Sequence, residues 1–471
     1  MHIKLNIVLD KLTNIILSKM TKAFKTAVFT ALAFASINAY AQNGVNSPYS
    51  RSGFGLMADR SMGFNKGMGG IAQGYRDGQS INTANPASLS ACDSLTALFD
   101  LGFSLQNGNY KMGGIQQNAK NSSFDYFAFH FRAVKGLGVA VSILPVTNIG
   151  YNFTSQSENV EGTDVKTYSS FTGNGGLHQV QLGLGLRVAK PLSIGANISY
   201  LYGDYSHTVS MPFSSTSSSS SSSISTITKY YTADISTYSL DLGAQYTQKL
   251  SDKNSMVFGL TYSLGHDINC DAQRTIMSAN SSSGTSESDT KTNPNAFQLP
   301  HSFAAGVTFY HSYKFLAGID YEFQKWGNVK FPNNQTNSSE YQSTTGQFND
   351  RMKIAAGLAW TPNIFSTSSY ADVITYKFGG FYSKSYANVE GVKLSDKPYE
   401  FGLTAGMTLP LANKNTNGGT PKLNVSFQWV HSNIPYLNAT TNVQDKLTEN
   451  YLRLNLGLTI SDRWFYKWKV K

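Results

Sequence analysis

Four basic side chains fall on the polar face of segments in which every second residue is apolar: Arg187, Lys353, Lys377 and Arg453. Because a strand alternates its side chains between two faces, each of these cations should point away from the apolar residues. A hydrophobic acid is bound by an apolar pocket with a cationic end, where charge-assisted hydrogen bonds hold the carboxylate. The four cations are therefore candidate ligand-binding residues.

The same cations have a second use, which is to pair with acidic residues on the same polar face. The acidic candidates are Asp100, Asp320, Glu322 and Glu400. Pairing explains the cations without any ligand, and the sequence favours it. Which of the four cations would meet a ligand stays open.

Catalysis and metal binding have little support. His431-Ser432-Asn433 resembles a fragment of the outer-membrane phospholipase, in which a histidine activates a serine nucleophile. No other part of the sequence matches that phospholipase. We therefore expect these three residues to lie at the rim of the barrel, where they face water or lipid headgroups. The other histidines are scattered without metal-ligand spacing. The strand glycines form no phosphate loop and should instead relieve crowding inside the lumen; they are Gly183, Gly185, Gly379, Gly402 and Gly406. We expect no catalytic residue, no metal and no cofactor.

The alternation that places these residues begins at 97–106, where Phe99, Leu101, Phe103 and Leu105 share one face. It recurs along the chain and predicts fourteen strands, an even number as in single-chain bacterial barrels. The predicted strands are 97–106, 123–132, 136–155, 177–188, 192–208, 229–249, 254–270, 300–311, 314–326, 350–361, 372–386, 398–410, 421–431 and 450–461.

Short and long connections alternate between these strands, for example 189–191 and then 209–228 with its Ser217–Ser223 run. Short turns on one rim and long polar loops on the other are typical of a transmembrane β-barrel. Aromatic residues make up 13% of the chain and charged residues only 14%, against about a quarter charged in soluble domains. The fold class is therefore an all-β, 14-stranded antiparallel transmembrane β-barrel, with a large soluble β protein as the alternative.

The N-terminus predicts export. Lys22 and Lys25 precede the apolar run 27–35, and Ala39-Tyr40-Ala41 forms a small-x-small cleavage site. Residues 1–41 are thus expected to be a signal peptide, with Met20 as an alternative start. The net charge of +10 comes from scattered residues, which does not favour nucleic acid, and two cysteines make no disulfide framework.

Residues 42–95 do not alternate and are rich in glycine. A barrel of about fourteen strands encloses a lumen that its own side chains do not fill. We therefore expect 42–95 to form a plug, or hatch, inside a barrel of residues 96–471, with an extended tail as the alternative.

Four motifs in this segment carry a family resemblance. They are Ser47-Pro48-Tyr49-Ser50-Arg51, Gly53-Phe54-Gly55, Gly67-Met68-Gly69-Gly70 and Asn85-Pro86-Ala87-Ser88. Together with the strand plan they resemble the outer-membrane hydrophobic-compound transporters of the long-chain fatty-acid and toluene (FadL and TodX) type, in a Bacteroidetes-like version. The resemblance implies a fourteen-stranded barrel with an N-terminal hatch.

The resemblance also implies that Asn85, Pro86 and Ala87 lie against a kinked third strand, where a lateral exit opens into the bilayer. In this chain the kink would fall near Pro145 and Gly150. The residues agree independently, because a strand interior tolerates proline only at a bulge, edge or kink. These five residues are the candidate gating site.

The function expected first is passive uptake of hydrophobic small molecules, such as long-chain fatty acids, across the bacterial outer membrane. The partners would then be outer-membrane lipid and a hydrophobic ligand, and the barrel a monomer. The alternative is a non-transporting barrel that serves as a surface-protein shuttle or scaffold in a secretion system, with a protein partner. A transporter needs an apolar pocket closed by the hatch, a scaffold needs a filled lumen, and a lipase would need Ser432.

Overall fold

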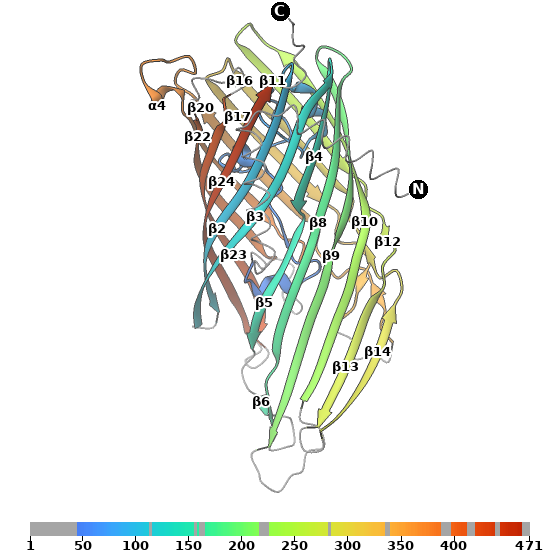
Figure 1. The fold of residues 1–471 in the computed structure, drawn as a ribbon. Coiled ribbons are helices and arrows are strands. Elements are labelled where there is room, and N and C mark those ends of the chain that lie inside the picture. Colours follow the sequence, from blue (N-terminus) through green and yellow to red (C-terminus); the bar gives the residue numbers. More distant parts are fainter. Residues whose placement is uncertain are drawn as a thin grey trace, which may run out of the picture.

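The computed structural model describes residues 45–112, 115–154, 158–159, 165–215, 226–280, 284–334, 340–387, 397–411, 420–438 and 443–463. They form a closed antiparallel barrel of fourteen strands, as the sequence predicted (Figure 1). The wall runs through β2 (Thr96–Met112), β3 (Ile115–Val134), β4 (Leu137–Pro145) continued by β5 (Thr147–Thr154), β8 (Ser170–Arg187), β9 (Leu192–Ser215), β10 (Thr226–Lys249), β11 (Asn254–Ser263), β16 (Ser302–His311), β17 (Phe315–Gln324), β20 (Arg351–Trp360), β21 (Thr375–Lys384), β22 (Tyr399–Pro410), β23 (Lys422–Asn438) and β24 (Val443–Arg463).

Closure comes from the pairing of the first and last wall strands. β2 pairs with β24 from Thr96 opposite Arg463 to Lys111 opposite Thr448. Every backbone polar group of a membrane strand must be paired within the protein, and a closed barrel satisfies this without an open edge.

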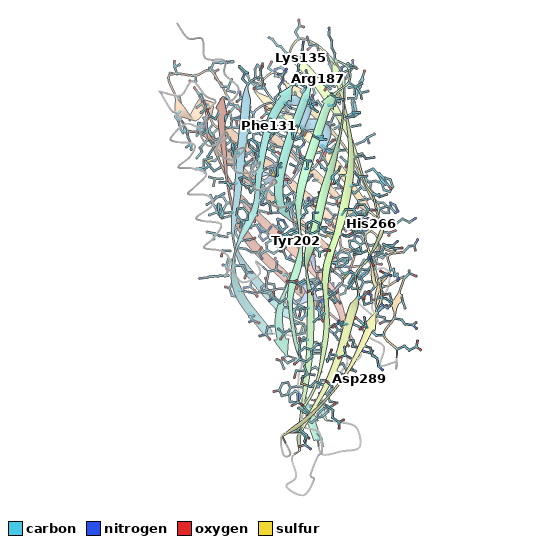
Figure 2. The ribbon with its side chains drawn as sticks, turned by 45° about the vertical axis from the view of Figure 1, so that its right-hand side comes forward. Phe131, Lys135, Arg187, Tyr202, His266 and Asp289 are labelled. Atoms are coloured by element: carbon cyan, nitrogen blue, oxygen red, sulfur yellow. The ribbon has the colours of Figure 1, made fainter. Side chains whose placement is uncertain are left out.

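The predicted alternation is confirmed on the barrel exterior. On β8, Leu182, Leu184 and Leu186 are exposed, while Gln181, which precedes Leu182, is buried in the lumen. Figure 2 shows Tyr202 and His266 at a similar height on the barrel, and each belongs to a stacked aromatic pair, His178–Tyr202 and Tyr238–His266. Aromatic girdles of this kind mark the headgroup level of a membrane barrel.

One predicted strand, 254–270, ends early. β11 stops at Ser263, and the chain leaves the wall to form β12 (Asp267–Ile268), β13 (Ala272–Asn280), β14 (Thr285–Asn293) and β15 (Phe297–Gln298). The reason is the length of β10, which pairs with β11 over 241–249 and with β13 over 226–232. Part of the predicted loop 271–299 is therefore a hairpin added to the sheet.

The two ends of the barrel differ. One end, the turn rim, carries the short connections 135–136, 188–191, 250–253 and 312–314, and also α4 (Tyr370–Val373). At the other end, the loop rim, β8, β9, β10 and the β13–β14 hairpin extend far past the shorter strands (Figure 1). The loop rim also holds β6 (Glu158–Asn159), β7 (Val165–Thr167), β18 (Phe331–Pro332) and β19 (Ser343–Thr344).

Residues 45–95, here called the N-terminal segment, lie inside the barrel (Figure 1). The segment contains η2 (Pro48–Arg51), β1 (Leu56–Met57), α3 (Gly63–Lys66) and η3 (Pro86–Ala91). Most of its side chains are buried against the wall. Over the described residues, no helix has the length and apolarity needed to span a membrane.

Candidate functional site

The N-terminal segment contacts the wall chiefly at glycines. We call them the glycine belt: Gly138, Gly185, Gly195, Gly243, Gly259, Gly357, Gly379 and Gly457. A Cβ atom at Gly259 would overlap the carbonyl of Gln73, and one at Gly357 would overlap Met68. The missing side chains therefore let backbone pack directly on backbone.

Half of the belt is continuous across four neighbouring strands. Gly138 pairs with Gly185, Gly185 with Gly195, and Gly195 with Gly243, so one row of glycines crosses β4, β8, β9 and β10. The row lies against η3. The sequence predicts that strand glycines relieve crowding in the lumen, and Gly185 and Gly379 do contact the N-terminal segment.

Polar anchors hold the same part of the segment. The carboxylate of Asp320 accepts hydrogen bonds from the backbone of Ala72 (2.5 Å) and Gln73 (2.8 Å). Lys66 forms an almost fully buried ion pair with Asp125 on β3. The Lys377 ammonium is fully buried and donates to Asn424 Oδ1 (3.1 Å) and to the carbonyl of Phe64 (3.1 Å).

The Asn85-Pro86-Ala87 motif lies against β8, β9 and β10. Asn85 Oδ1 accepts from the backbone of Ala87 (3.1 Å) and caps η3, while Nδ2 donates to the carbonyls of Gln73 (3.0 Å) and Ala244 (3.3 Å). Pro86 packs on Gly185, Gly195 and Gly243. These contacts place the motif away from Gly150, which is instead contacted by Ser47 and Ser50.

The predicted break in the third strand lies between β4 and β5, at Val146. β1 pairs with β5 there, with Leu56 opposite Asn148. Val146 N donates to the carbonyl of Leu177 (2.7 Å), and Ala58 N donates to the carbonyl of Val146 (3.0 Å). The N-terminal segment therefore bridges the break by backbone hydrogen bonds.

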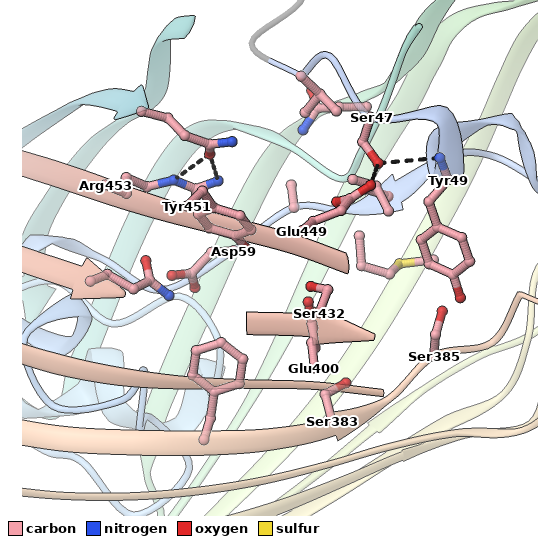
Figure 3. Close-up of a pocket in the computed structure, with 18 of the residues that line it drawn as sticks. Ser47, Tyr49, Asp59, Ser383, Ser385, Glu400, Ser432, Glu449, Tyr451 and Arg453 are labelled. Carbon is pink, nitrogen blue, oxygen red and sulfur yellow. Dashed lines mark hydrogen bonds between the residues drawn. The ribbon is translucent and has the colours of Figure 1, made fainter. Parts of the chain in front are cut away.

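A cavity of about 140 Å³ lies on the loop-rim side of these contacts (Figure 3). Its lining combines charged groups of both signs from the N-terminal segment and from the wall strands. They are Lys66, Arg351, Lys353, Arg453, Asp59, Asp125, Glu400 and Glu449. The cavity is smaller and more polar than the pockets that usually bind small apolar ligands.

Several buried polar atoms face this cavity without a partner among the described residues. They include Ser383 Oγ, Gln428 Oε1 and Asn121 Nδ2. On the N-terminal segment, burial raises the pKa of the Asp59 carboxyl, but Lys353, Lys66 and hydrogen bonds from Ser61 outweigh it and hold that pKa below its ordinary value. Such a lining suits water or a polar molecule better than a hydrocarbon.

The four predicted ligand-binding cations do not converge. Lys353 and Arg453 line the cavity, where Arg453 donates twice to Gln106 Oε1 (2.6 and 3.1 Å). Lys377 is enclosed by the N-terminal segment, and Arg187 is exposed on the turn rim, as Figure 2 shows.

The expected acidic partners have other contacts. Asp320 binds backbone amides, and Glu322 pairs with Arg351 (3.0 Å). Sequence reasoning missed Arg351, although its alternation with Lys353 on β20 would have placed it on the same inward face.

His431 and Ser432 are consecutive on β23 and therefore point to opposite faces. His431 contacts the exterior aromatics Phe401 and Trp429, while Ser432 lines the cavity. The geometry does not bring them together as a nucleophile and its base. Among the residues that the structure describes, no group of three or more His, Cys, Asp or Glu side chains is placed to hold a metal ion.

An aromatic cluster that the sequence did not predict covers the outer part of the N-terminal segment. Phe54 contacts Phe331 (ring centroids 5.0 Å apart) and Phe297 (5.5 Å), and Trp326 stacks on Tyr386 (4.3 Å). The cluster joins β15, β18 and neighbouring residues of the loop rim to the segment inside the barrel. No signal other than the aromatic content of these loops points to it.

The fold and the internal segment define the class of FadL-like barrels, and solved structures agree. The CymD monoaromatic hydrocarbon channel matches with a TM-score of 0.55 and 14% identity, over 86% of this chain and 98% of that chain. A Pseudomonas aeruginosa FadL homologue matches with a TM-score of 0.57 and 11% identity, over 87% of this chain and 99% of that chain. The Ralstonia pickettii toluene transporter TbuX matches with a TM-score of 0.55 and 13% identity, over 88% of this chain and 100% of that chain. At such low identity the likeness shows the fold alone.

The family is more specific than the fold. The BamG family model matches residues 20–471, which is nearly the whole chain, and the protein belongs to that family. The resemblance to FadL-type transporters therefore holds at the level of the fold, while the matching family bears a different name. A comparison with curated proteins finds no match.

Proposed function

We propose that the protein is an outer-membrane barrel whose N-terminal segment closes the lumen and whose loop rim binds protein partners. In this proposal it is a scaffold in a secretion or assembly system. Residues 1–41 are its export signal, and the turn rim faces the periplasm. The observation that carries the proposal is the glycine belt, because a wall shaped to the backbone of its plug favours a permanent seal over a gate.

The cavity supports the same function. A channel for hydrophobic molecules needs an apolar route, whereas the lining here is charged and holds only about 140 Å³. The bridged break between β4 and β5 also argues against a lateral exit at Val146.

The partner surface in this proposal is the sheet that extends past the loop rim. β13 and β14 add a hairpin to β10, and the side chains of β14 from Thr285 to Thr290 are all exposed. Asp289 lies near the far end of this extension (Figure 2). An added hairpin is not needed to close the barrel, so a binding role explains its presence.

The second candidate is passive uptake of hydrophobic small molecules. It is favoured by the solved neighbours, several of which are described as hydrocarbon channels or toluene transporters. In that case Lys353 and Arg453 would be the cations that meet a carboxylate, since both line the cavity.

One experiment with two readouts separates the candidates. The mature protein in liposomes is tested for permeation of a labelled long-chain fatty acid and of toluene. In cells, a photo-crosslinking amino acid replaces Ser288 on β14 or, as a control, lipid-facing Leu403 on β22.

The scaffold proposal expects no permeation above protein-free liposomes and a protein adduct of one defined mass at Ser288 but not at Leu403. Saturable permeation together with no adduct at Ser288 would overturn the proposal in favour of uptake.

A further inference from the structure

Each short turn of the turn rim exposes an apolar side chain and a lysine. The apolar residues are Val134 (62% exposed), Val188 (57%), Leu250 (54%) and Tyr313 (75%), and the lysines are Lys135, Lys190, Lys253 and Lys314. All four lysines are exposed. Exposed apolar side chains at every turn tip are unfavourable in water, so this pattern calls for a cover that is itself partly apolar.

The arrangement of these exposed turn residues indicates what packs against them. They are single side chains spread along the rim from the β3–β4 turn to the β16–β17 turn, not one contiguous patch of the kind that binds a protein. They lie just past the last outward aromatics, Trp360 and Tyr376, whose rings are 5.9 Å apart. Apolar tips with lysines at the edge of an aromatic girdle fit the headgroup layer of a bilayer leaflet.

Two of these turns, 250–253 and 312–314, come together with the longer turn that carries Phe365 in a groove of about 430 Å³. The turns are fastened by a hydrogen bond from Ser312 N to the carbonyl of Lys253 (2.6 Å) and by one from Thr361 N to the carbonyl of Lys314 (2.8 Å). Tyr313 meets Phe365 edge to face, with centroids 6.4 Å apart, and Phe365 is 77% exposed. The longer turn that carries Phe365 and α4 projects outward from the barrel (Figure 1).

The groove is basic. Its charged lining residues are Lys249, Lys253, Lys314 and Asp252, and the single carboxylate pairs with Lys249 at 3.5 Å. Lys253 and Lys314 therefore have no carboxylate within ion-pair distance among the described residues. His311 at the edge is engaged with Asn254 (2.7 Å).

We propose that this groove binds the phosphate of an anionic phospholipid from the leaflet that surrounds the turn rim. Lys253 and Lys314 face the phosphate, Tyr313 and Phe365 contact the glycerol and the upper acyl chains, and the remaining turn lysines hold neighbouring headgroups. Basic pockets at a membrane surface select anionic headgroups by this chemistry. The inference stands apart from the choice between scaffold and channel, since it concerns the outside of the rim.

The test is lipid retention, measured by native mass spectrometry on the mature protein in detergent with added phosphatidylglycerol or phosphatidylcholine. We expect wild type to retain phosphatidylglycerol preferentially, and Lys253→Gln/Lys314→Gln to lose about tenfold or more of that retention. The matched control is Lys111→Gln/Lys120→Gln, which removes the same charge at the loop rim and should retain lipid as wild type does. Heat-modifiable migration on gels checks that each variant is folded.

Two outcomes would overturn the proposal. One is equal retention of the two lipids by wild type, and the other is unchanged phosphatidylglycerol retention in the groove variant. Competition by an acidic peptide but not by added phosphatidylglycerol would assign the groove to a periplasmic protein instead.

Discussion

The two parts of the N-terminal segment meet the barrel in different ways. Residues 61–92 lie against the glycine belt, where backbone packs on backbone, whereas residues 45–60 line a polar cavity together with charged wall residues. The first contact leaves no room for a solute, and the second leaves room for water and small polar molecules. We therefore expect closure of the lumen to depend mainly on the inner part.

The largest expected effect comes from the ion pair that anchors the inner part. Lys66→Met leaves the Asp125 carboxylate buried, with Ser104 (2.7 Å) as its one remaining side-chain donor among the described residues. Breaking a buried pair costs about 3–5 kcal/mol of unfolding free energy. Urea unfolding in detergent micelles measures it.

The double variant Lys66→Met/Asp125→Leu removes both charges and should regain most of the lost unfolding free energy. If Lys66→Met alone unfolds like wild type, the ion pair does not anchor the segment and the comparison between the two parts fails.

A substitution in the glycine belt is expected to cost less stability than loss of the ion pair but to open a path for ions through the lumen. In Gly259→Val the new side chain overlaps the carbonyl of Gln73, so the segment must shift inward. Overpacking of this kind costs about 1–3 kcal/mol. Single-channel recording in planar bilayers should show ion conductance that wild type lacks.

The control for this variant is Ala305→Val, which introduces the same side chain on the lipid-facing side of β16, opposite exposed Leu260. It should neither conduct nor lose stability. Conductance by wild type equal to that of Gly259→Val would show that the belt does not seal the lumen.

Asn85 tests the cap within the inner part. Asn85→Ala removes the acceptor for Ala87 N and leaves the carbonyls of Gln73 and Ala244 without this donor. Loss of a cap costs about 0.5–2 kcal/mol, and we expect the upper half of that range because Asn85 is fully buried. Asn118→Ala, on an exposed part of β3, serves as the control in the same unfolding assay and should change nothing.

The sequence predicts the wall better than the interior, for a physical reason. A wall strand obeys one local rule, alternation between lipid and lumen, so 177–188 is legible from its own residues. The belt depends on which backbone each glycine meets, and that information lies in distant residues: Gly259 is explained only by Gln73. For the same reason β13 was not predicted, because its partner is the far end of β10, a distant part of the chain.

The five residues expected from the sequence to form a gate show both sides of this limit. Pro145 marks a real break because proline cannot donate to the ladder, a local property. Which part of the N-terminal segment packs on this break is not a local property: the structure pairs β1 with β5 there, while Asn85 lies at β8–β10. Motifs therefore identified the segment that enters the barrel but not where each part of it would lie.

The smallest expected effect is that of Ser383→Ala, which is compared with the effect of changing a second serine, Ser104, that lines the same cavity. Ser104 Oγ donates to Asp125, which belongs to the anchor of the inner part, whereas Ser383 Oγ has no partner among the described residues. Ser104→Ala should lose about 1.5–3 kcal/mol, as expected for a hydrogen bond to a charged group. Ser383→Ala should change the unfolding free energy by less than about 0.5 kcal/mol, since no protein hydrogen bond is lost and water in the cavity fills the space. A large loss in Ser383→Ala would mean that the outer part is held as tightly as the inner part, and the cavity would then be a structural element instead of spare polar volume.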